Sequence, residues 1–395
     1  MLNNPQMPGL DNSNITPIRI QKSGHMIAIK VVAAIAAILI ALLLGLIVFL
    51  LIGFETGPVG LMIGLVSATI PVPLYILLVL WVDRYESEPL SMLAMAFFWG
   101  ALVAVFFALV LNTASGVIVA GLTDDRVGEA FSAGISAPIV EESAKAIILL
   151  LFFFLRKEEF DGVVDGIVYA AMAGLGFAMT ENIQYYGRAV LQGGGGGLTL
   201  VFIIRGMLAP FSHPLFTAMT GMGLGLARQS RNTFIKIVAP VLGLGLAIFL
   251  HSVWNGSAIV FGFLGFILIY VLIMVPTFFI VLAVIFVSLR REGRVVRDFL
   301  LADYQRGMLS PEEYNQLCSV RGRMGASFNA LSRGGITHWR TSMRFNQTAS
   351  ELAFHRSRVA RGIGAEHPDV HEREAAYLRL MEDLVRRLRA GRTAT

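Results

Sequence analysis

Charge and cysteine are both scarce in this sequence. Only 15% of its 395 residues are Asp, Glu, Lys or Arg, whereas about 25% is usual for a soluble domain. The single cysteine, Cys318, excludes an intrachain disulfide and a zinc site built from cysteines. Runs such as Val31–Leu51 contain no polar residue, so they lack the polar face of a helix in a soluble enzyme. Together these shortages exclude a soluble protein.

Hydrophobic residues make up 55% of the chain and are arranged in long blocks. A helix needs roughly 20 apolar residues to cross a bilayer. The blocks predict about eight crossings: Met26–Phe54, Val59–Val82, Ser91–Asn112, Ala130–Leu155, Val163–Tyr186, Leu198–Ala227, Phe234–Gly256 and Ser257–Leu289. The first block is too long for a cleavable signal, so we expect it to remain as an anchor. The predicted fold class is all-α, a polytopic transmembrane helical bundle.

Positive charges predict the orientation of this bundle. With eight crossings, the loops on one side carry Arg19, Lys22, Arg84, Arg156, Lys157, Arg228, Arg231 and Arg290, and those on the other carry Arg126 and Arg188. Loops rich in Lys and Arg stay in the cytoplasm. We therefore expect both termini inside the cell and the glycine run Gly193–Gly197 in a flexible outer loop. The expected location is a bacterial plasma membrane.

Three regions follow from these patterns. Residues 1–25 form a cytoplasmic N-terminal tail, residues 26–289 the membrane bundle, and residues 290–395 a small helical cytoplasmic tail. This last region has 19 arginines, no lysine and 12 acids, a net charge of +7. Ser310-Pro311-Glu312-Glu313 is typical of a helix start, with Ser as N-cap and Glu closing a capping box. Asn346–Arg361 and Val370–Arg389 also suit amphipathic helices. The tail suits anionic headgroups, a cytoplasmic partner or plain solvation, but no nucleic-acid motif is present.

Ionisable residues within the predicted crossings are the candidate functional residues. Each costs about 2.5–3.5 kcal/mol at the centre of a bilayer, so several together require a polar cluster or a hydrated cavity. They are Glu141, Glu142 and Lys145 in the fourth crossing, Asp165, Glu181 and Asn182 in the fifth, Arg205 and His213 in the sixth, and His251 and Asn255 in the seventh. For Asp165 an interfacial role is the simpler interpretation. For Arg205 it is an ion pair with Glu181 or a contact with lipid headgroups.

Helical spacing predicts which of these side chains meet. Glu141 and Lys145 stand i and i+4 and share a helix face, as do His251 and Asn255. Glu142 is turned by about 100° from Glu141 and can face a different neighbour. At about 1.5 Å per residue, four of them fall in the outer half of the bilayer, namely Glu141, Glu181, His213 and His251. We therefore predict one cluster between four neighbouring helices.

Such a cluster suits the hydrolysis of a peptide bond by two routes. In the first, Glu141 or Glu142 activates a water molecule while His251 and Asn255 donate hydrogen bonds to the oxyanion. In the second, Glu141, Glu181, His213 and His251 bind one divalent ion such as zinc, which carries the water. The sequence leaves both routes open. A serine route through Gly134-Ile135-Ser136 is also conceivable, but it leaves the glutamates without a role.

Ordered motifs resemble a known protease family. Neither His-Glu-x-x-His nor Gly-x-Gly-Asp occurs in the chain. Instead Asp83-Arg84-Tyr85-Glu86, Glu141-Glu142-Ser143-Ala144-Lys145, Asp165 through Glu181-Asn182, His213 and His251-Ser252-Val253-Trp254-Asn255 follow one another between residues 83 and 256. This series resembles the PrsW family of membrane proteases, within the wider superfamily of CAAX prenyl endopeptidases and Abi proteins. The tail lies outside the resemblance.

The resemblance implies an intramembrane endopeptidase with a site formed by Glu141, Glu142, Glu181, His213, His251 and Asn255. Families of this type are associated with cutting single-span, anti-sigma-factor-like proteins, so the expected partners are a membrane-embedded protein substrate and the bilayer. The PrsW branch is described as metalloprotease-like, which implies metal dependence. Two other classes stay open. One is a non-catalytic scaffold or bacteriocin-immunity-type protein, and the other is a proton-coupled transporter, which the lack of a visible internal repeat disfavours.

Overall fold

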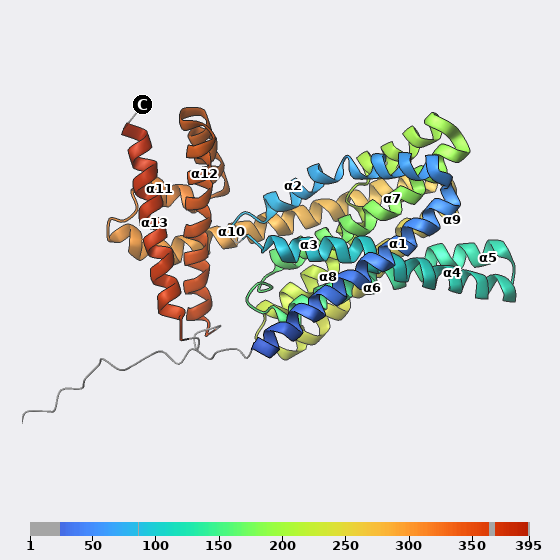
Figure 1. Cartoon of the computed structure of the whole chain (residues 1–395), viewed down its shortest axis with the longest axis horizontal. Coiled ribbons are helices and arrows are strands. Elements are labelled where there is room, and N and C mark those ends of the chain that lie inside the picture. Colours follow the sequence, from blue (N-terminus) through green and yellow to red (C-terminus); the bar gives the residue numbers. More distant parts are fainter. Residues whose placement is uncertain (1–23, 86, 363–367, 394–395) are drawn as a thin grey trace, which may run out of the picture. The chain divides into compact units, whose positions relative to one another are not determined.

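A computed structural model describes residues 24–85, 87–362 and 368–393 of the chain. These residues form helices and no strand, as predicted (Figure 1). Segments labelled η are π-helical turns. In chain order the elements are α1 (Gly24–Thr69), α2 (Val72–Val82), α3 (Leu90–Phe98), η2 (Trp99–Ala104), α4 (Val105–Leu122), α5 (Asp125–Phe131), η3 (Ser132–Ser136), α6 (Ala137–Leu155), α7 (Val163–Phe202), η4 (Ile203–Leu208), α8 (Ser212–Gln229), α9 (Thr233–Ile269), η5 (Tyr270–Met274), α10 (Val275–Gln305), α11 (Pro311–Leu317), α12 (Val320–Ala360) and α13 (Val370–Thr393).

Several long helices double back at one glycine. Gly57 in α1, Gly194 in α7 and Gly262 in α9 have φ angles of 64°, 56° and 63°, which residues with a side chain rarely adopt. Trp254 precedes Gly262 in α9 and Phe266 follows it, and the rings of these two residues lie 4.7 Å apart. In a continuous helix these two residues would be about 18 Å apart. The chain therefore reverses direction there, and the glycine run that contains Gly194 holds a turn.

Four helical stretches are long and apolar enough to cross a membrane. They are Val31–Val82, Leu90–Leu122, Val163–Gln229 and Thr233–Gln305. Helix α6, which carries two glutamates and a lysine, is not among the four. Three of the stretches exceed 50 residues, and each contains one of the glycine reversals. The protein is thus a helical membrane protein, with more helical length than a single passage per stretch requires.

The chain divides into two units, Met1–Leu43 and Leu44–Thr395. The described part of the first unit, residues 24–43, is the N-terminal half of α1. Apolar side chains such as Val32 and Leu39 are exposed along it. Exposed aliphatic side chains over this length suit contact with lipid rather than water.

The first half of α7 is the core of the second unit. Nearly every residue from Val163 to Ala178 is buried. Small residues allow the backbone of α8 to approach closely, because a Cβ on Gly174 would lie 2.6 Å from the nitrogen of Pro214. Gly166 and Gly221 approach each other in the same way. This packing fixes the start of α8, and therefore His213, against α7.

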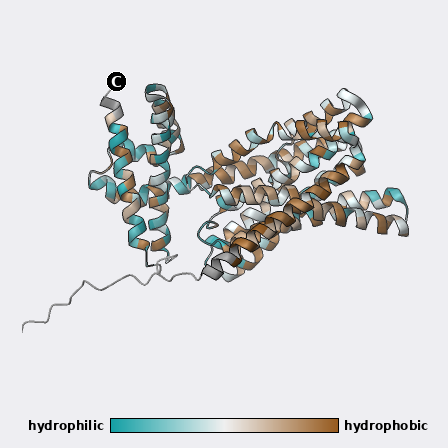
Figure 2. Ribbon diagram, in the orientation of Figure 1, coloured by the Kyte–Doolittle hydropathy of each residue, from teal (hydrophilic) through white to brown (hydrophobic). Residues whose placement is uncertain are grey.

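The C-terminal region is a small polar helical bundle. Figure 2 shows hydrophilic residues over much of α11–α13, in contrast to the apolar helices before them. The predicted helix start is confirmed, since Ser310 Oγ accepts from the amide of Glu313 and Glu313 Oε2 accepts from the amide of Ser310. Helix α13 begins at Val370 as predicted, whereas α12 begins at Val320, well before Asn346, and reverses at Gly335.

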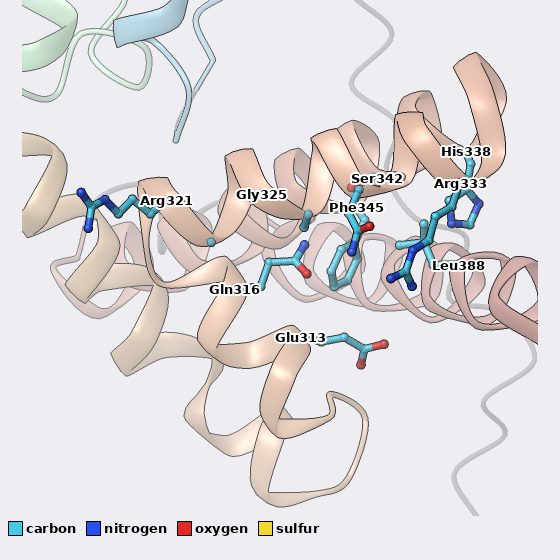
Figure 3. A pocket seen from close by; sticks show the side chains of 13 residues that line it. Glu313, Gln316, Arg321, Gly325, Arg333, His338, Ser342, Phe345 and Leu388 are labelled. Atoms are coloured by element: carbon cyan, nitrogen blue, oxygen red, sulfur yellow. The ribbon is translucent and has the colours of Figure 1, made fainter.

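This bundle encloses a cavity and contacts the loops of the membrane region. The cavity has a volume of about 320 Å³, with Arg321 at one end and Arg333 and His338 at the other (Figure 3). Outside it, Arg361 pairs with Asp161 at 2.9 Å, next to the start of α7. The tail is therefore attached to the end of the membrane bundle by specific polar contacts.

Candidate active site

Helix α6 carries three ionisable side chains into the interior of the bundle. Pro138 lies in its first turn, where the missing N–H needs no partner. Glu141, Glu142 and Lys145 follow, and each has 5% or less of its surface exposed. Their spacing places two different faces of one helix toward neighbouring helices. The interior around α6 therefore contains a cluster of charges that must be compensated by its surroundings.

Lys145 lies at the centre of this cluster. Its Nζ is 2.8 Å from Oε1 of Glu142 and 3.7 Å from Oε2 of Glu141. The same ammonium lies 3.1 Å from Nδ1 of His213 and 3.9 Å from the ring centre of Phe177. An ammonium has only donors, so Nδ1 of His213 must be the acceptor. Lys145 therefore compensates the two glutamates and fixes the tautomer of one histidine.

Glu142 is fully partnered and orients His251. Besides Lys145, its carboxylate accepts from Thr217 Oγ1 at 2.9 Å and contacts Nδ1 of His251 at 3.0 Å. Because the carboxylate only accepts, Nδ1 of His251 carries the proton. The ring stacks on Phe216, with centroids 4.9 Å apart. Nε2 of His251 is thereby left with its lone pair free.

Glu181 orients the second histidine. Its Oε2 lies 2.8 Å from Nε2 of His213 and also pairs with the guanidinium of Arg205. Nε of Arg205 donates to Oδ1 of Asn182 at 2.6 Å. The ion pair between Arg205 and Glu181 confirms the structural role expected for Arg205. The arrangement holds the proton of His213 on Nε2, on the side away from Lys145.

Glu141 differs from the other two glutamates. Its Oε1 has one long contact, 3.5 Å from the amide of Asn112, and its Oε2 is buried without a hydrogen-bond partner. Nε2 of His251 lies 3.8 Å from this oxygen. A buried carboxylate oxygen usually has partners in a folded protein, so one without them indicates a place for a ligand or water.

Asn255 and Ser136 do not face the cluster. The amide of Asn255 donates to the carbonyl of Ala133 at 2.9 Å. Asn255 stands one helical turn after His251, as predicted, but its side chain does not point to the group that His251 contacts. Ser136 Oγ donates to Oδ1 of Asn112 at 2.9 Å and contacts Ser115 at 2.8 Å. The structure therefore brings together five of the six predicted residues and leaves Asn255 at the edge.

Two side chains that contact the cluster were missed by the sequence analysis. Thr217 stands four residues after His213, so helical spacing would have placed it on the same face of α8. Asn112, at the end of a predicted crossing, gave no such signal, because its contact with Glu141 arises only from tertiary packing.

Three residues of the cluster suit a metal ion. Glu141, His213 and His251 each offer one ligand atom, and these atoms lie within 4.8 Å of one another. One carboxylate and two imidazoles are a common zinc ligand set that leaves a position for water. The free oxygen of Glu141 and the free Nε2 of His251 agree with this set. Glu181, also suggested by the sequence, is not part of the group, because it holds His213 instead.

Comparison with known proteins decides the family. A family model described as the PrsW family intramembrane metalloprotease matches residues 88–281, which include every residue of the cluster. Protease PrsW from Geobacillus kaustophilus (strain HTA426) is 34% identical over 176 residues, 44% of this chain and 69% of that protein. The chain belongs to the PrsW family. It is therefore an intramembrane protease, as its motifs implied.

Two further PrsW proteases are also similar to this chain. The protein from Bacillus subtilis (strain 168) is 30% identical over 44% of this chain and 71% of its own length. The one from Oceanobacillus iheyensis is 30% identical over 49% of this chain and 82% of its own. No solved structure matches the chain. The family match ends at residue 281, so the arginine-rich tail lies outside the part shared with the PrsW model.

Proposed function

We propose that the chain cuts a peptide bond of a membrane-embedded protein at the cluster of Glu141, Glu142, Glu181, His213 and His251. One observation carries this proposal: Oε2 of Glu141 is buried without a hydrogen-bond partner, 3.8 Å from Nε2 of His251 and 3.7 Å from the ammonium of Lys145. A carboxylate with an oxygen that accepts no hydrogen bond can bind a divalent ion or, without one, take a proton from an attacking water and give it to the leaving amine. The carboxylates of Glu142 and Glu181 are committed to other side chains and serve to position them.

The cofactor that we propose is one divalent, zinc-like ion held by Glu141, His213 and His251. When bound, such an ion lowers the pKa of a water and polarises a carbonyl group. Glu142 keeps the proton of His251 on Nδ1, which leaves Nε2 available as a ligand. Glu181 likewise keeps the proton of His213 on Nε2, so Nδ1 is available once the ammonium of Lys145 withdraws from it.

A metal-free route is the alternative mechanism. There Glu141 alone activates the water, and His251 with Asn255 donates to the oxyanion, as the resemblance to CAAX prenyl endopeptidases implies. Asn255 would have to leave the carbonyl of Ala133 to take part. The present orientation of its amide therefore supports the metal route over this one.

We propose eight crossings with both termini in the cytoplasm of a bacterial cell. The reversals at Gly57, Gly194 and Gly262 support this count, since each divides a long apolar stretch into two arms. The cluster then lies in the outer half of the bilayer, which suits a single-span substrate of the anti-sigma-factor type. Reporter fusions after Gly57 and Gly194 are expected to be extracellular, and a fusion after Arg361 cytoplasmic.

The proposal is tested with purified protein in lipid vesicles and a single-span membrane protein as substrate. We expect Glu141→Gln to abolish cleavage and Glu55→Gln to preserve it, because Glu55 pairs with Arg188 outside the cluster. Elemental analysis of the same preparations is expected to find one equivalent of a divalent metal in wild type and less in His213→Gln. Cleavage that survives in the Glu141 variant would refute the assignment of the site.

A further inference from the structure

Helix α10 contacts the bundle through one narrow stripe of side chains. Met274, at the end of η5, is followed by Phe278, Val281 and Ile285 at helical spacing, and three of these four are buried. The opposite side, represented by Ile280, is exposed. The stripe faces α8 and, farther along, α2 and α7. One side of α10 thus covers the bundle, and it does so incompletely.

Two cavities lie beneath this stripe. The first, about 280 Å³, is bounded by the segment from η4 to the start of α8 and by Trp254, Tyr270 and Met274. The second, also about 280 Å³, is lined by apolar residues of α2, α7, α8 and α10. Phe211, Leu215 and Phe278 line both, so the two form one groove along α10. The two cavities are open on one side and lined mainly by apolar side chains, which leaves room for an apolar occupant that enters from the lipid.

Two residues that line the first cavity have backbone groups without a hydrogen bond. Between η4 and α8 the helix is interrupted at Ala209–Phe211. Within the described chain, neither the amide of Phe211 nor the carbonyl of Pro210 forms a hydrogen bond. The usual helical partner of the Pro210 carbonyl would be the amide of residue 214, but Pro214 has no N–H. Unpaired backbone groups at membrane depth need a partner. A lipid acyl chain provides none, whereas an extended polypeptide provides both donors and acceptors.

Two residues that line the first cavity are close in sequence to the histidines of the active site. Ser212, which lines the first cavity, directly precedes His213. Trp254, on the other wall, lies one helical turn after His251. Between them the ring of Phe216 is 4.9 Å from His251 and 6.5 Å from Trp254. A chain bound in the first cavity would therefore be separated from His251 by one buried ring, that of Phe216.

We propose that the groove between α8 and α10 binds the unwound transmembrane segment of a protein substrate. Apolar side chains of the substrate occupy the two cavities, and its backbone pairs with Pro210 and Phe211. The inference rests on the proposed protease function and adds the route by which a substrate reaches the site from the lipid. It also makes Phe278 and Leu215 determinants of specificity for bulky apolar residues near the cleaved bond.

Photo-crosslinking with two adjacent phenylalanines tests this proposal. Benzoylphenylalanine replaces either Phe278, which lines both cavities, or Phe279, which is 61% exposed on α10. Both proteins carry Glu141→Gln, so that cleavage does not consume the probe. The probe is a biotinylated leucine-rich peptide of about 20 residues with a central glycine pair, in phosphatidylcholine vesicles. We expect about tenfold more peptide adduct at position 278 than at 279.

Equal peptide adducts at the two positions, or adducts of position 278 with lipid alone, would overturn the groove as the substrate site. Crosslinking does not depend on catalysis, so the two proposals can fail separately. If wild type does not cleave but position 278 captures the peptide, the proposed chemistry fails and the groove stands. If wild type cleaves but position 278 captures only lipid, the groove fails and the active site stands.

Discussion

Two buried ionic clusters in the described part of the chain use carboxylates and cations differently. In the tail, Arg356 donates to both oxygens of Asp303, to Glu374 and to the carbonyl of Phe299. The carboxylate of Asp303 is fully buried and doubly paired. In the membrane bundle, by contrast, Glu141 retains an oxygen with no hydrogen bond. The comparison indicates that complete pairing marks a cluster that stabilises the fold, and incomplete pairing marks one that binds something.

The free energies of these interactions support this distinction. A buried polar group without a partner costs about 1–3 kcal/mol, and more if it is charged. Natural proteins keep such groups mainly at functional sites. Glu142 shows that the surroundings of α6 are able to satisfy a carboxylate completely, since Lys145, Thr217 and His251 all contact it. The incomplete pairing of the neighbouring Glu141 therefore does not follow from a shortage of donors.

The largest effect is expected from Glu141→Gln. The amide keeps the volume of the side chain but cannot act as a base, so turnover should fall by about 10³-fold or more. The melting temperature of the variant should stay within a few degrees of wild type, because Oε2 accepts no hydrogen bond and Lys145, 3.7 Å away, keeps Glu142 as its partner. Cleavage of a single-span substrate and thermal unfolding are measured on the same preparation. Turnover within tenfold of wild type would contradict the inference that the incompletely paired Glu141 marks the functional cluster.

Metal removal should have the next largest effect. Dialysis against a chelator is expected to lower activity by about 10²-fold or more, with recovery on addition of zinc. The tail cluster has no imidazole in its ion pairs, so its contribution to stability should be unaffected. Full activity in protein that elemental analysis shows to be metal-free would favour the glutamate route instead.

The tail cluster should show the opposite behaviour. Arg356→Met leaves the buried carboxylate of Asp303 without its partner, which typically costs about 3–5 kcal/mol of stability. The cluster lies outside the family match, so turnover per folded molecule should stay within about twofold of wild type. Denaturation and cleavage assays separate the two readouts. A large fall in turnover with unchanged stability would show that the tail takes part in catalysis.

Displacing a histidine without changing any charge should give an intermediate effect. In Gly174→Ala the new Cβ would lie 2.6 Å from the nitrogen of Pro214, so α8 must move and take His213 with it. A displacement of this kind is expected to reduce turnover about tenfold or more. Gly245→Ala in α9 is the matched control, since a Cβ there meets no atom within 4 Å. Equal activity in the two variants would mean that the position of His213 is not critical.

Helical spacing in the sequence is sufficient to place most of the cluster. The i and i+4 relation puts Glu141 beside Lys145, and charges inside crossings must meet because isolated ones are too costly. The same rule failed for Asn255. Helical spacing fixes the face of α9 on which the amide of Asn255 lies, but it does not fix the group that the amide contacts. That group is the carbonyl of Ala133 in η3, outside the cluster.

The parts that the sequence could not provide depend on tertiary packing. A contiguous helical pattern gives no sign of the interruption at Ala209–Phe211, although Pro210 and Pro214 are visible once the break is known. The ligand group is a similar case. The sequence offers four candidate metal ligands. Only the contacts of Glu181 with His213 and Arg205 show that Glu181 orients His213 and is not itself a ligand.

The smallest effect is expected at a third kind of buried carboxylate, neither paired with a cation nor in the active site. Asp83 follows the last residue of α2, and among the described residues its carboxylate accepts from the amide of Glu88 and has no cation as a partner. Burial, with a further contribution from Asp165, raises its pKa from 3.8 to about 8. The folded state therefore binds a proton that the unfolded state loses, and stability falls as pH rises from about 4 to about 8. Asp83→Asn keeps the acceptor and removes the titration. Its melting temperature relative to wild type should rise across this range, by roughly 2–4 °C at pH 8. A difference between the two proteins that does not change with pH would mean that Asp83 is ionised in the folded protein, and that its surroundings already compensate the charge.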